Sequence, residues 1–107
     1  MNPKIFITYS SKDQKVSTTI CRALEQRGIV CWISSRDVKP GQNYQEQIVK
    51  AIRSAKVMVL VFTANANNSN EIKKELALAS QNSLIVIPVA YTIFDDWRRG
   101  GRFGTTA

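Results

Sequence analysis

Four short apolar segments alternate with three segments of helical apolar spacing, and this alternation constrains the fold of the 107-residue chain more than any other feature. The segment Val57–Phe62 (VMVLVF) is continuously apolar, which predicts a strand buried on both faces in a parallel sheet covered by helices. The other predicted strands are residues 5–9, 29–33 and 84–89, the last also buried. Strands that alternate with helices imply right-handed crossovers. The sequence therefore predicts an α/β fold in the order β-α-β-α-β-α-β.

The three segments between the strands carry the signals that begin and end helices. Gly28 stands where a helix usually ends, and Ser69 is a candidate N-cap for the third helix. Residues 34–43, with the turn signal Pro40-Gly41, and residues 63–70 are predicted to be loops. The apolar residues at helical spacing are Val16, Ile20, Ala23 and Leu24 in the first helix, Ile48, Ala51, Ile52 and Ala55 in the second, and Ile72, Leu76 and Ala79 in the third.

The C-terminal residues 93–107 have no helical periodicity and contain three glycines in a basic, polar context. We expect one domain over residues 1–92, followed by an irregular tail. The helix that would complete the cover of the sheet is then missing, as in a fragment or a diverged copy of a longer protein.

The composition is that of a globular protein, with 44% hydrophobic and 21% charged residues. The net charge of +7 indicates a lysine-rich solvated surface or affinity for a phosphorylated ligand. The basic residues are scattered and no aromatic residues are interleaved with them, so nucleic-acid binding is not expected. The N-terminal apolar run is too short for a signal peptide, and no stretch is long enough to span a membrane. We therefore expect a cytoplasmic protein.

The chain contains no histidine and two cysteines, Cys21 and Cys31. Two cysteines make neither a disulfide framework nor a zinc site, and both lie in apolar segments where free cysteine behaves as a small buried hydrophobe. No metal site is expected. Without histidine, catalysis must depend on carboxylates, Lys, Tyr, Ser or Cys.

Ligands of open parallel sheets bind beyond the carboxyl ends of the strands. The candidate binding residues at that edge are Tyr9, Ser10, Ser11, Ser34, Arg36, Asp37 and Glu71. Five of them also have a simpler interpretation. Ser10 and Ser11 are equally compatible with helix caps, although a capped helix N-terminus also attracts anions. Arg36 and Asp37 fit a solvated turn, and Tyr9 and Trp32 fit the core.

Four pieces of the sequence carry a resemblance to a known family. They are residues 5–13 (IFITYSSKD), 33–52 (ISSRDVKPGQNYQEQIVKAI), 57–79 (VMVLVFTANANNSNEIKKELALA) and 84–89 (LIVIPV). In this order and spacing they resemble the Toll/interleukin-1 receptor (TIR) domain, in particular its bacterial type. The resemblance implies a flavodoxin-like, doubly wound parallel sheet.

Many TIR domains cleave NAD⁺ to nicotinamide and ADP-ribose or a cyclic ADP-ribose, whereas others serve only as assembly modules. The resemblance implies NAD⁺ as substrate with no further cofactor, and self-association through TIR–TIR contacts under the control of a partner domain outside this chain. The loop after the second strand then closes over the site or contacts a neighbouring subunit. The essential glutamate of the enzymes follows a Ser-x-x-x-x-x-Glu-Leu pattern, which identifies Glu75 between Ser69 and Leu76.

The helical position of Glu75 is compatible with this role. At about 100° per residue it lies roughly 65° from the centre of the apolar stripe, whereas Lys74 points away. A half-buried carboxylate can stabilise the oxocarbenium character that develops on the ribose, and nicotinamide leaves as a neutral group. Active members often carry an aromatic residue four positions earlier, where this chain has Glu71. The simpler alternative is a surface glutamate paired with Lys74.

The function predicted from the sequence is an NAD⁺ glycohydrolase (NAD⁺ nucleosidase) of bacterial defence, active when assembled. The alternative is a non-catalytic TIR–TIR interaction module or a mimic that interferes with host signalling. A phospho-receiver or a flavin protein is disfavoured. The acidic cluster that a receiver needs after the first strand is replaced by Ser10-Ser11-Lys12, and no glycine-rich phosphate loop is present.

Overall fold

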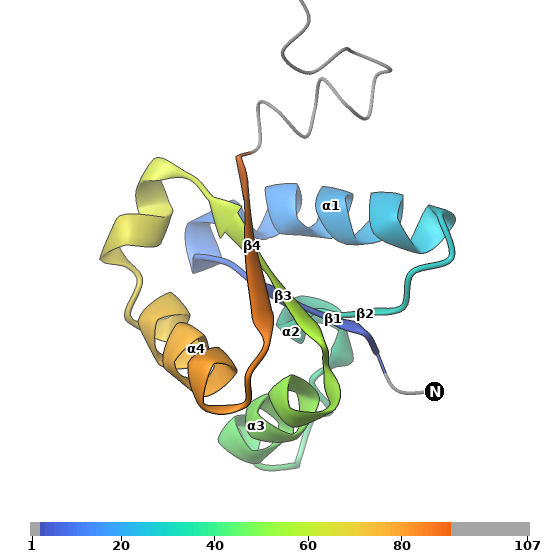
Figure 1. Ribbon diagram of the computed structural model, residues 1–107, viewed down its shortest axis with the longest axis vertical. Helices are drawn as coiled ribbons and strands as arrows, with labels where there is room; N and C mark the ends of the chain where they lie inside the picture. The colour runs from blue at the N-terminus through green and yellow to red at the C-terminus, as the bar shows by residue number, and fades with distance from the viewer. Residues whose placement is uncertain (1–2, 91–107) are drawn as a thin grey trace, which may run out of the picture.

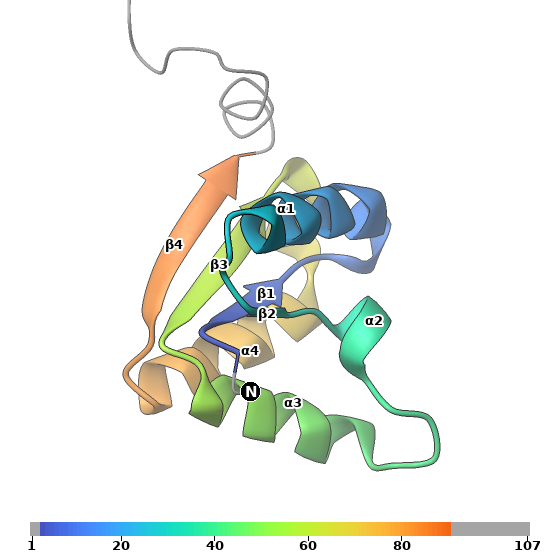
Figure 2. The ribbon, with the colours of Figure 1, turned by 90° about the vertical axis from the view of Figure 1, so that its right-hand side faces the viewer.

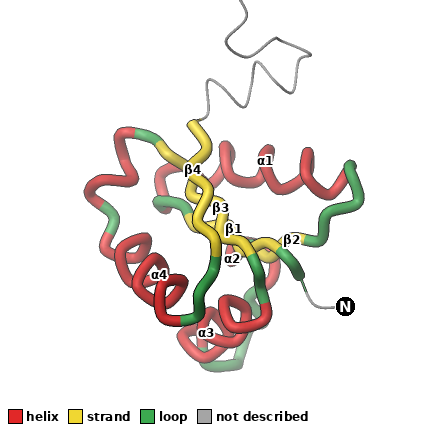
Figure 3. The backbone as a smooth tube through the Cα atoms, viewed as in Figure 1, coloured by secondary structure: helices red, strands yellow, loops and turns green. Residues whose placement is uncertain are grey.

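The computed structural model describes residues 3–90, which form an α/β domain with one sheet (Figure 1). Three helices connect the four strands, and three shorter helical segments lie in the loops (Figure 3). In chain order the elements are β1 (Ile5–Thr8), the 3₁₀ helix η1 (Ser11–Asp13), α1 (Gln14–Gln26), β2 (Cys31–Trp32), α2 (Ser34–Asp37), α3 (Tyr44–Ser54), β3 (Val57–Phe62), the 3₁₀ helix η2 (Ala64–Asn68), α4 (Asn70–Gln81) and β4 (Ile85–Ala90).

The sheet is parallel throughout, with the strand order β2-β1-β3-β4. This is the beginning of the flavodoxin-like order 2-1-3-4-5, so the predicted fold class is confirmed. The register aligns Ile5 of β1 with Cys31 of β2 and with Val57 of β3. Because the order reverses beside β1, the carboxyl ends of β1 and β3 face the point where a crevice is expected.

Two apolar clusters fill the space on the two faces of the sheet. Alternate residues of a strand point to opposite faces, so Ile7 and Val59 pack under α1 while Phe6 and Met58 pack under α3 and α4. Figure 2 shows this sandwich from the side, with α1 on one face and α3 and α4 on the other. The helices are thereby held at fixed positions relative to the strand ends.

The helices begin and end where side-chain chemistry satisfies their free backbone groups. The Asn43 carboxamide accepts a hydrogen bond from the amide of Glu46 at 2.9 Å, and the Ser69 hydroxyl accepts one from the amide of Ile72 at 3.2 Å. Gly28 follows α1 with a φ of +80°, a conformation that only glycine adopts without strain. The N-cap predicted for Ser69 and the stop predicted for Gly28 are both confirmed.

The strand predicted at residues 84–89 exists as β4, but the prediction that it is buried is wrong. Ile85 is 65% exposed and Ile87 is 45% exposed. By register these two side chains share the α1 face with Val57 and Val59, and among the described residues α1 is the only helix on that face. In the strand order β4 is also the last strand, and among the described residues nothing lies beyond it.

Pro88 fits the edge position of β4. The amide of Ile85 donates to the carbonyl of Lys56, the residue directly before β3, so the backbone groups of residues 85, 87 and 89 face β3. The backbone of Pro88, which has no N–H to donate, therefore faces the free edge, where a proline costs no ladder hydrogen bond.

The two predicted loops also contain short helices. Residues 34–43 include α2, and residues 63–70 include η2 and the first residue of α4 (Figure 3). Turn-forming residues are compatible with single helical turns, which have no apolar periodicity to reveal them. The tail predicted at residues 93–107 lies outside the described residues, and the domain boundary predicted at residue 92 stays a prediction.

Candidate functional site

A pocket of about 240 Å³ opens at the carboxyl-terminal edge of the sheet. Its walls come from the segment after β1, the start of α2, and the first turns of α1, α3 and α4. The lining residues are Tyr9, Ser11, Gln14, Ser34, Tyr44, Ser69, Glu71 and Glu75. The structure therefore brings together five of the predicted site residues, which are Tyr9, Ser11, Ser34, Glu71 and Glu75.

Glu75 is the half-buried carboxylate of this pocket, and it is held by a buried hydroxyl. Thr8, the last residue of β1, is fully buried and donates a hydrogen bond from Oγ1 to Glu75 Oε1 at 2.7 Å. Burial raises the pKa of Glu75 to about 7, the negative charge of Glu71 adds to the rise, and the hydrogen bond from Thr8 opposes it. A carboxyl group that titrates near neutrality and points into a pocket is a feature of functional sites.

The helical arrangement predicted for α4 is confirmed. Ile72 and Ala79 are buried, Glu75 is half-buried at the margin of the stripe, and Lys74 is exposed. Glu75 accepts a hydrogen bond from Thr8 and forms no ion pair with Lys74, so the alternative of a surface glutamate paired with its neighbour is not what the structure shows.

Two tyrosines flank the carboxylate and give the pocket its aromatic surface. The hydroxyl groups of Tyr9 and Ser34 are hydrogen-bonded at 3.0 Å, which ties the end of β1 to the start of α2. Tyr44, the first residue of α3, is 39% exposed, and burial together with the charges of Glu71 and Glu75 raises its pKa. Tyr9 is thus a wall of the pocket as well as a neighbour of the core.

Tyr44 was not predicted from the sequence, and neither were Thr8 and Gln14. Helix α3 was predicted from its apolar residues at helical spacing, and Tyr44 is not one of them. A usable signal was present, because Asn43 is an N-cap residue and the helix that follows a strand of a parallel sheet begins near the carboxyl ends of the strands. Thr8 carried no signal, since a threonine in a strand is ordinary.

A second, polar hollow of about 280 Å³ adjoins the first. It lies between the beginnings of η1 and α4 and shares Ser11, Ser69 and Glu71 with the Glu75 pocket. Hydroxyl and carboxamide groups dominate it. The remaining lining residues are Ser10, Lys12, Asn65, Asn68 and Asn70.

Asp13 anchors the walls of this hollow. It is 7% exposed, and its two carboxylate oxygens accept hydrogen bonds from Thr63 Oγ1 at 2.5 Å and from Asn65 Nδ2 at 3.0 Å. These bonds join the start of α1 to the loop after β3. Asp13 therefore holds in place two segments that are 50 residues apart in the chain.

Replacement of Asp13 with Ala is expected to lower the free energy of unfolding by about 1–3 kcal/mol, because two partly buried polar side chains lose their acceptor. Urea denaturation followed by circular dichroism measures the change. Lys12→Ala, which alters an exposed neighbour, is the matched control and should remain within about 0.5 kcal/mol of the wild type. Equal stability of the two variants would contradict an anchoring role.

Three predicted site residues, Ser10, Arg36 and Asp37, do not line the Glu75 pocket. Ser10 is buried and its hydroxyl caps η1, accepting a hydrogen bond from the amide of Lys12 at 3.4 Å. Arg36 is directed toward α1 and β2, where it pairs with Glu25 at 2.7 Å and with Asp37 at 2.8 Å. The expectation that Arg36 and Asp37 border the same crevice is therefore corrected, because their ion pairs hold them beside α1 and β2, whereas Ser10 lines the polar hollow that adjoins the pocket.

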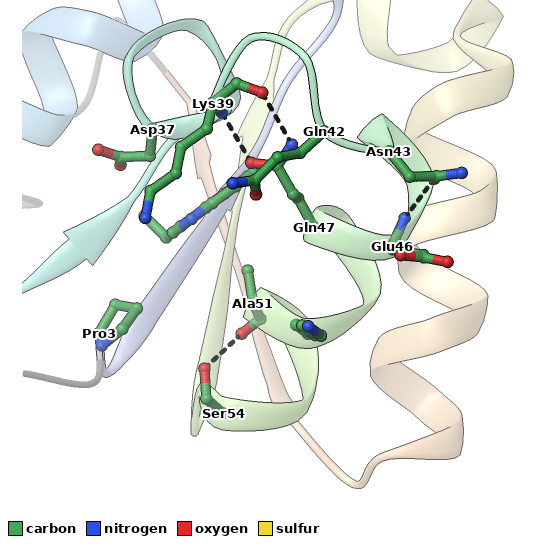
Figure 4. Close-up of a pocket in the computed structure, with 11 residues that line it drawn as sticks. Pro3, Asp37, Lys39, Gln42, Asn43, Glu46, Gln47, Ala51 and Ser54 are labelled. Atoms are coloured by element: carbon green, nitrogen blue, oxygen red, sulfur yellow. Dashed lines mark hydrogen bonds between the residues drawn. The ribbon is translucent and has the colours of Figure 1, made fainter.

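The loop after α2 borders a different cavity, of about 460 Å³, between the loop, β2 and α3 (Figure 4). Two hydrogen bonds fix the loop to α3, since the Gln47 carboxamide accepts from the amide of Lys39 at 2.7 Å and donates to its carbonyl at 3.1 Å. Trp32, half-buried beside this cavity, stacks on Phe6 with ring centroids 5.1 Å apart. Trp32 thus has the core role that the sequence suggested.

Comparison with known proteins decides the family. A family model described as TIR domain matches residues 5–103. This chain belongs to the TIR domain family. The TIR domain of a Toll-related receptor from Hydra magnipapillata has the same fold, with a TM-score of 0.75 and 23% identity over 91% of this chain and 94% of that chain.

Two curated relatives are longer than this chain. A protein of Brachypodium distachyon named a probable 2′ cyclic ADP-D-ribose synthase is 28% identical over 92 residues, which are 84% of this TIR domain chain and 41% of the relative. A stimulator of interferon genes protein of Magallana gigas is 30% identical over 90 residues, 78% of this chain and 22% of the relative. The chain thus spans less than half the length of each.

Within residues 3–90 of this TIR domain, no helix is long and apolar enough to cross a membrane. The same residues contain no group of three His, Cys, Asp or Glu side chains that could hold a metal ion.

Proposed function

We propose that this TIR domain is an NAD⁺ glycohydrolase that cleaves the bond between nicotinamide and ribose and forms ADP-ribose or a cyclic ADP-ribose. The observation that carries the proposal is Glu75, a half-buried carboxyl group held by Thr8 in a pocket with aromatic walls. The name of the Brachypodium relative, a probable 2′ cyclic ADP-D-ribose synthase, supports the substrate class.

The proposed chemistry requires the ionised form of Glu75. As nicotinamide leaves, positive charge develops on the ribose, and a fixed carboxylate in a partly dry pocket stabilises it. The same carboxylate can accept hydrogen bonds from ribose hydroxyls, which orients the sugar. No protonated group is needed for the leaving nicotinamide because it departs uncharged, so the absence of histidine is compatible with the reaction.

Other residues of the pocket would bind the rest of the substrate. Tyr9 and Tyr44 offer aromatic faces to the nicotinamide ring, in place of the aromatic residue that active relatives often carry where this chain has Glu71. The adjoining polar hollow, with Lys12 beside it, can accommodate the diphosphate. Both contributions are part of the proposal.

The size of the pocket favours activity in an assembled state. Pockets that bury a drug-sized ligand usually measure about 300–1,000 Å³, and the Glu75 pocket measures about 240 Å³. NAD⁺ is larger than such ligands, so one chain encloses only part of it. A neighbouring TIR domain would complete the enclosure, and self-association through TIR–TIR contacts is therefore part of the proposed function.

Nicotinamide release from NAD⁺, followed by liquid chromatography, tests the proposal. The protein is assayed at high concentration and on an oligomerising scaffold. The wild type is expected to release nicotinamide and Glu75→Ala is not. Lys74→Ala, an exposed change beside Glu75 on α4 at a residue that does not line the pocket, is the matched control and should retain activity. If the assembled wild type releases no nicotinamide, the enzymatic function is refuted.

That outcome would favour the second candidate, a non-catalytic interaction module. The exposed apolar side chains of β4 support this candidate because exposed apolar surface is typical of interaction sites. Size-exclusion chromatography with light scattering would then show association without turnover.

A further inference from the structure

Thr8 places a buried hydroxyl group at the carboxyl end of β1, directly beside the Glu75 pocket. Its residue is 0% exposed and lies in register with Leu60 of β3, so its backbone is fixed within the sheet. Alternate residues of a strand point to opposite faces, and the Thr8 side chain therefore shares the face of Phe6, which α3 and α4 cover. A buried, branched side chain has few rotamers, so this hydroxyl is a donor of fixed position.

The Thr8 hydroxyl gives the two oxygens of the Glu75 carboxyl different surroundings. Thr8 Oγ1 donates to Glu75 Oε1 at 2.7 Å, a distance typical of a hydroxyl bonded to a charged acceptor. Within residues 3–90, every buried side-chain nitrogen or oxygen atom has a hydrogen-bond partner, and Thr8 is the only partner of the Glu75 carboxyl. Oε2 accepts no hydrogen bond, so it is not buried and is open to the pocket that Glu75 lines.

Thr8 is also the neighbour on which the charged form of this carboxyl depends. Burial raises the pKa of Glu75 to about 7, the hydrogen bond from Thr8 opposes the rise, and the charge of Glu71 adds to it. The other titratable groups around Glu75 are Tyr44 on α3 and Tyr9 after β1. No lysine or arginine is among the described residues that line the pocket. A single hydroxyl therefore stabilises the carboxylate.

We propose that Thr8 is the positioning residue of this site: its hydroxyl anchors Oε1 of Glu75, so that Oε2 is presented to the ribose of the substrate. The role in the reaction rests on the NAD⁺ cleavage proposed above, whereas the anchoring is a property of the protein without substrate. A carboxylate that is fixed before the reaction needs no ordering when positive charge develops on the sugar.

Replacement of Thr8 with Val, which removes the hydroxyl and keeps the shape of the side chain, tests the anchoring without substrate. The glutamate carboxyl carbons are isotopically labelled, and the NMR signal of Glu75, assigned with Glu75→Gln, is followed from pH 4 to pH 10. The pKa of Glu75, about 7 in the wild type, is expected to rise by about one to two pH units, because the charged form loses its donor. Thr8→Ser keeps the hydroxyl and should titrate as the wild type does.

Urea denaturation separates this anchoring from ordinary packing. A higher pKa of Glu75 in the folded state extends the range over which stability is lost as pH rises, so Thr8→Val should lower the urea midpoint more at pH 9 than at pH 4. A packing defect would lower it equally at both. Thr19→Val, which removes a hydroxyl bonded within α1 and outside the pocket, is the matched control and should leave the pKa of Glu75 unchanged.

Thermal melts at pH 5, where Glu75 is protonated, establish that the variants are folded, and Thr8→Ala replaces Thr8→Val if the latter is not. On the oligomerising scaffold, kcat/KM at pH 7 is expected to fall roughly tenfold to a hundredfold without the hydroxyl, with the pH profile displaced to higher pH, and Thr8→Ser should restore both.

The proposal is overturned if the folded variant without the hydroxyl keeps the wild-type pKa of Glu75, or if it keeps the wild-type rate and pH profile. If the pKa rises but the assembled wild type releases no nicotinamide, the anchoring of Glu75 is supported and the NAD⁺ cleavage, with the role of Thr8 in it, is refuted. The two failures are thereby distinguished.

Discussion

Nicotinamide release by this TIR domain is expected to fall about tenfold for each pH unit below pH 7, because the proposed reaction needs Glu75 as a carboxylate. Burial raises the pKa of Glu75 to about 7, so at pH 5 only a small fraction of the free protein carries the charge. The measurement is kcat/KM between pH 5 and 9, since this ratio reports the ionisation of the free enzyme. A rate that is flat from pH 5 to 8 would contradict a catalytic carboxylate with this pKa.

The contribution of Glu75 to stability has the opposite pH dependence to the expected rate. Between pH 4.5 and about 7 the folded state keeps the proton that the unfolded state has lost, so stability falls as pH rises. The difference between the pKa of 4.5 in the unfolded state and about 7 in the folded state corresponds to at most roughly 3 kcal/mol of stability. The partial exposure of Glu75 lowers this contribution. The contribution of Glu75 thus makes the domain more stable at pH 5, where the rate is low.

Glu75→Gln isolates this contribution. The carboxamide oxygen can still accept the hydrogen bond from Thr8, and the side chain carries no charge to bury. Above pH 7 the variant is expected to be about 1–3 kcal/mol more stable than the wild type, whereas below pH 4.5 the two should be equally stable. Urea titrations at pH 4 and pH 8 measure both values. Equal stability at pH 8 would show that Glu75 is solvated and not held in the pocket as described.

Replacement of Ile52 with Ala is expected to lower the free energy of unfolding by about 2–5 kcal/mol. Ile52 is 0% exposed and lies at the centre of the cluster that joins α3 to the sheet, in company with Phe6 and Met58. The cost is the lost burial of three methyl or methylene groups together with the cavity that remains. Because small domains are stable by only about 5–15 kcal/mol, this change alone removes a large share of the stability.

Urea denaturation measures the effect, with Lys50→Ala as the matched control on the exposed side of the same helix. That control should change the stability by no more than about 0.5 kcal/mol. A cost below about 1 kcal/mol for Ile52→Ala would mean that the space between α3 and the sheet is not packed as the structure has it. The variant also tests how far the pocket depends on α3, since Tyr44 is the first residue of that helix.

Local patterns in the sequence determined the elements of this domain and their order. The continuous apolar run Val57–Phe62 became a strand with the predicted bounds, and the positions of Ser69 and Gly28 marked helix ends correctly. The spacing of Ile72, Leu76 and Ala79 placed Glu75 at the margin of a buried stripe. These features depend on interactions within a few residues of one another, and such interactions leave a periodic trace in the sequence.

Only the tertiary structure decided which polar side chains share a pocket with Glu75. Thr8, in β1, donates a hydrogen bond to Glu75, and Tyr44, at the start of α3, lines the pocket. Arg36 instead forms an ion pair with Glu25 on α1 and lies outside the pocket. The exposure of β4 was equally hidden, because an apolar strand has the same sequence whether or not a helix covers it. Contacts between residues 25 or 67 positions apart, such as Tyr9 with Ser34 and Thr8 with Glu75, depend on how layers pack and leave no local pattern to read.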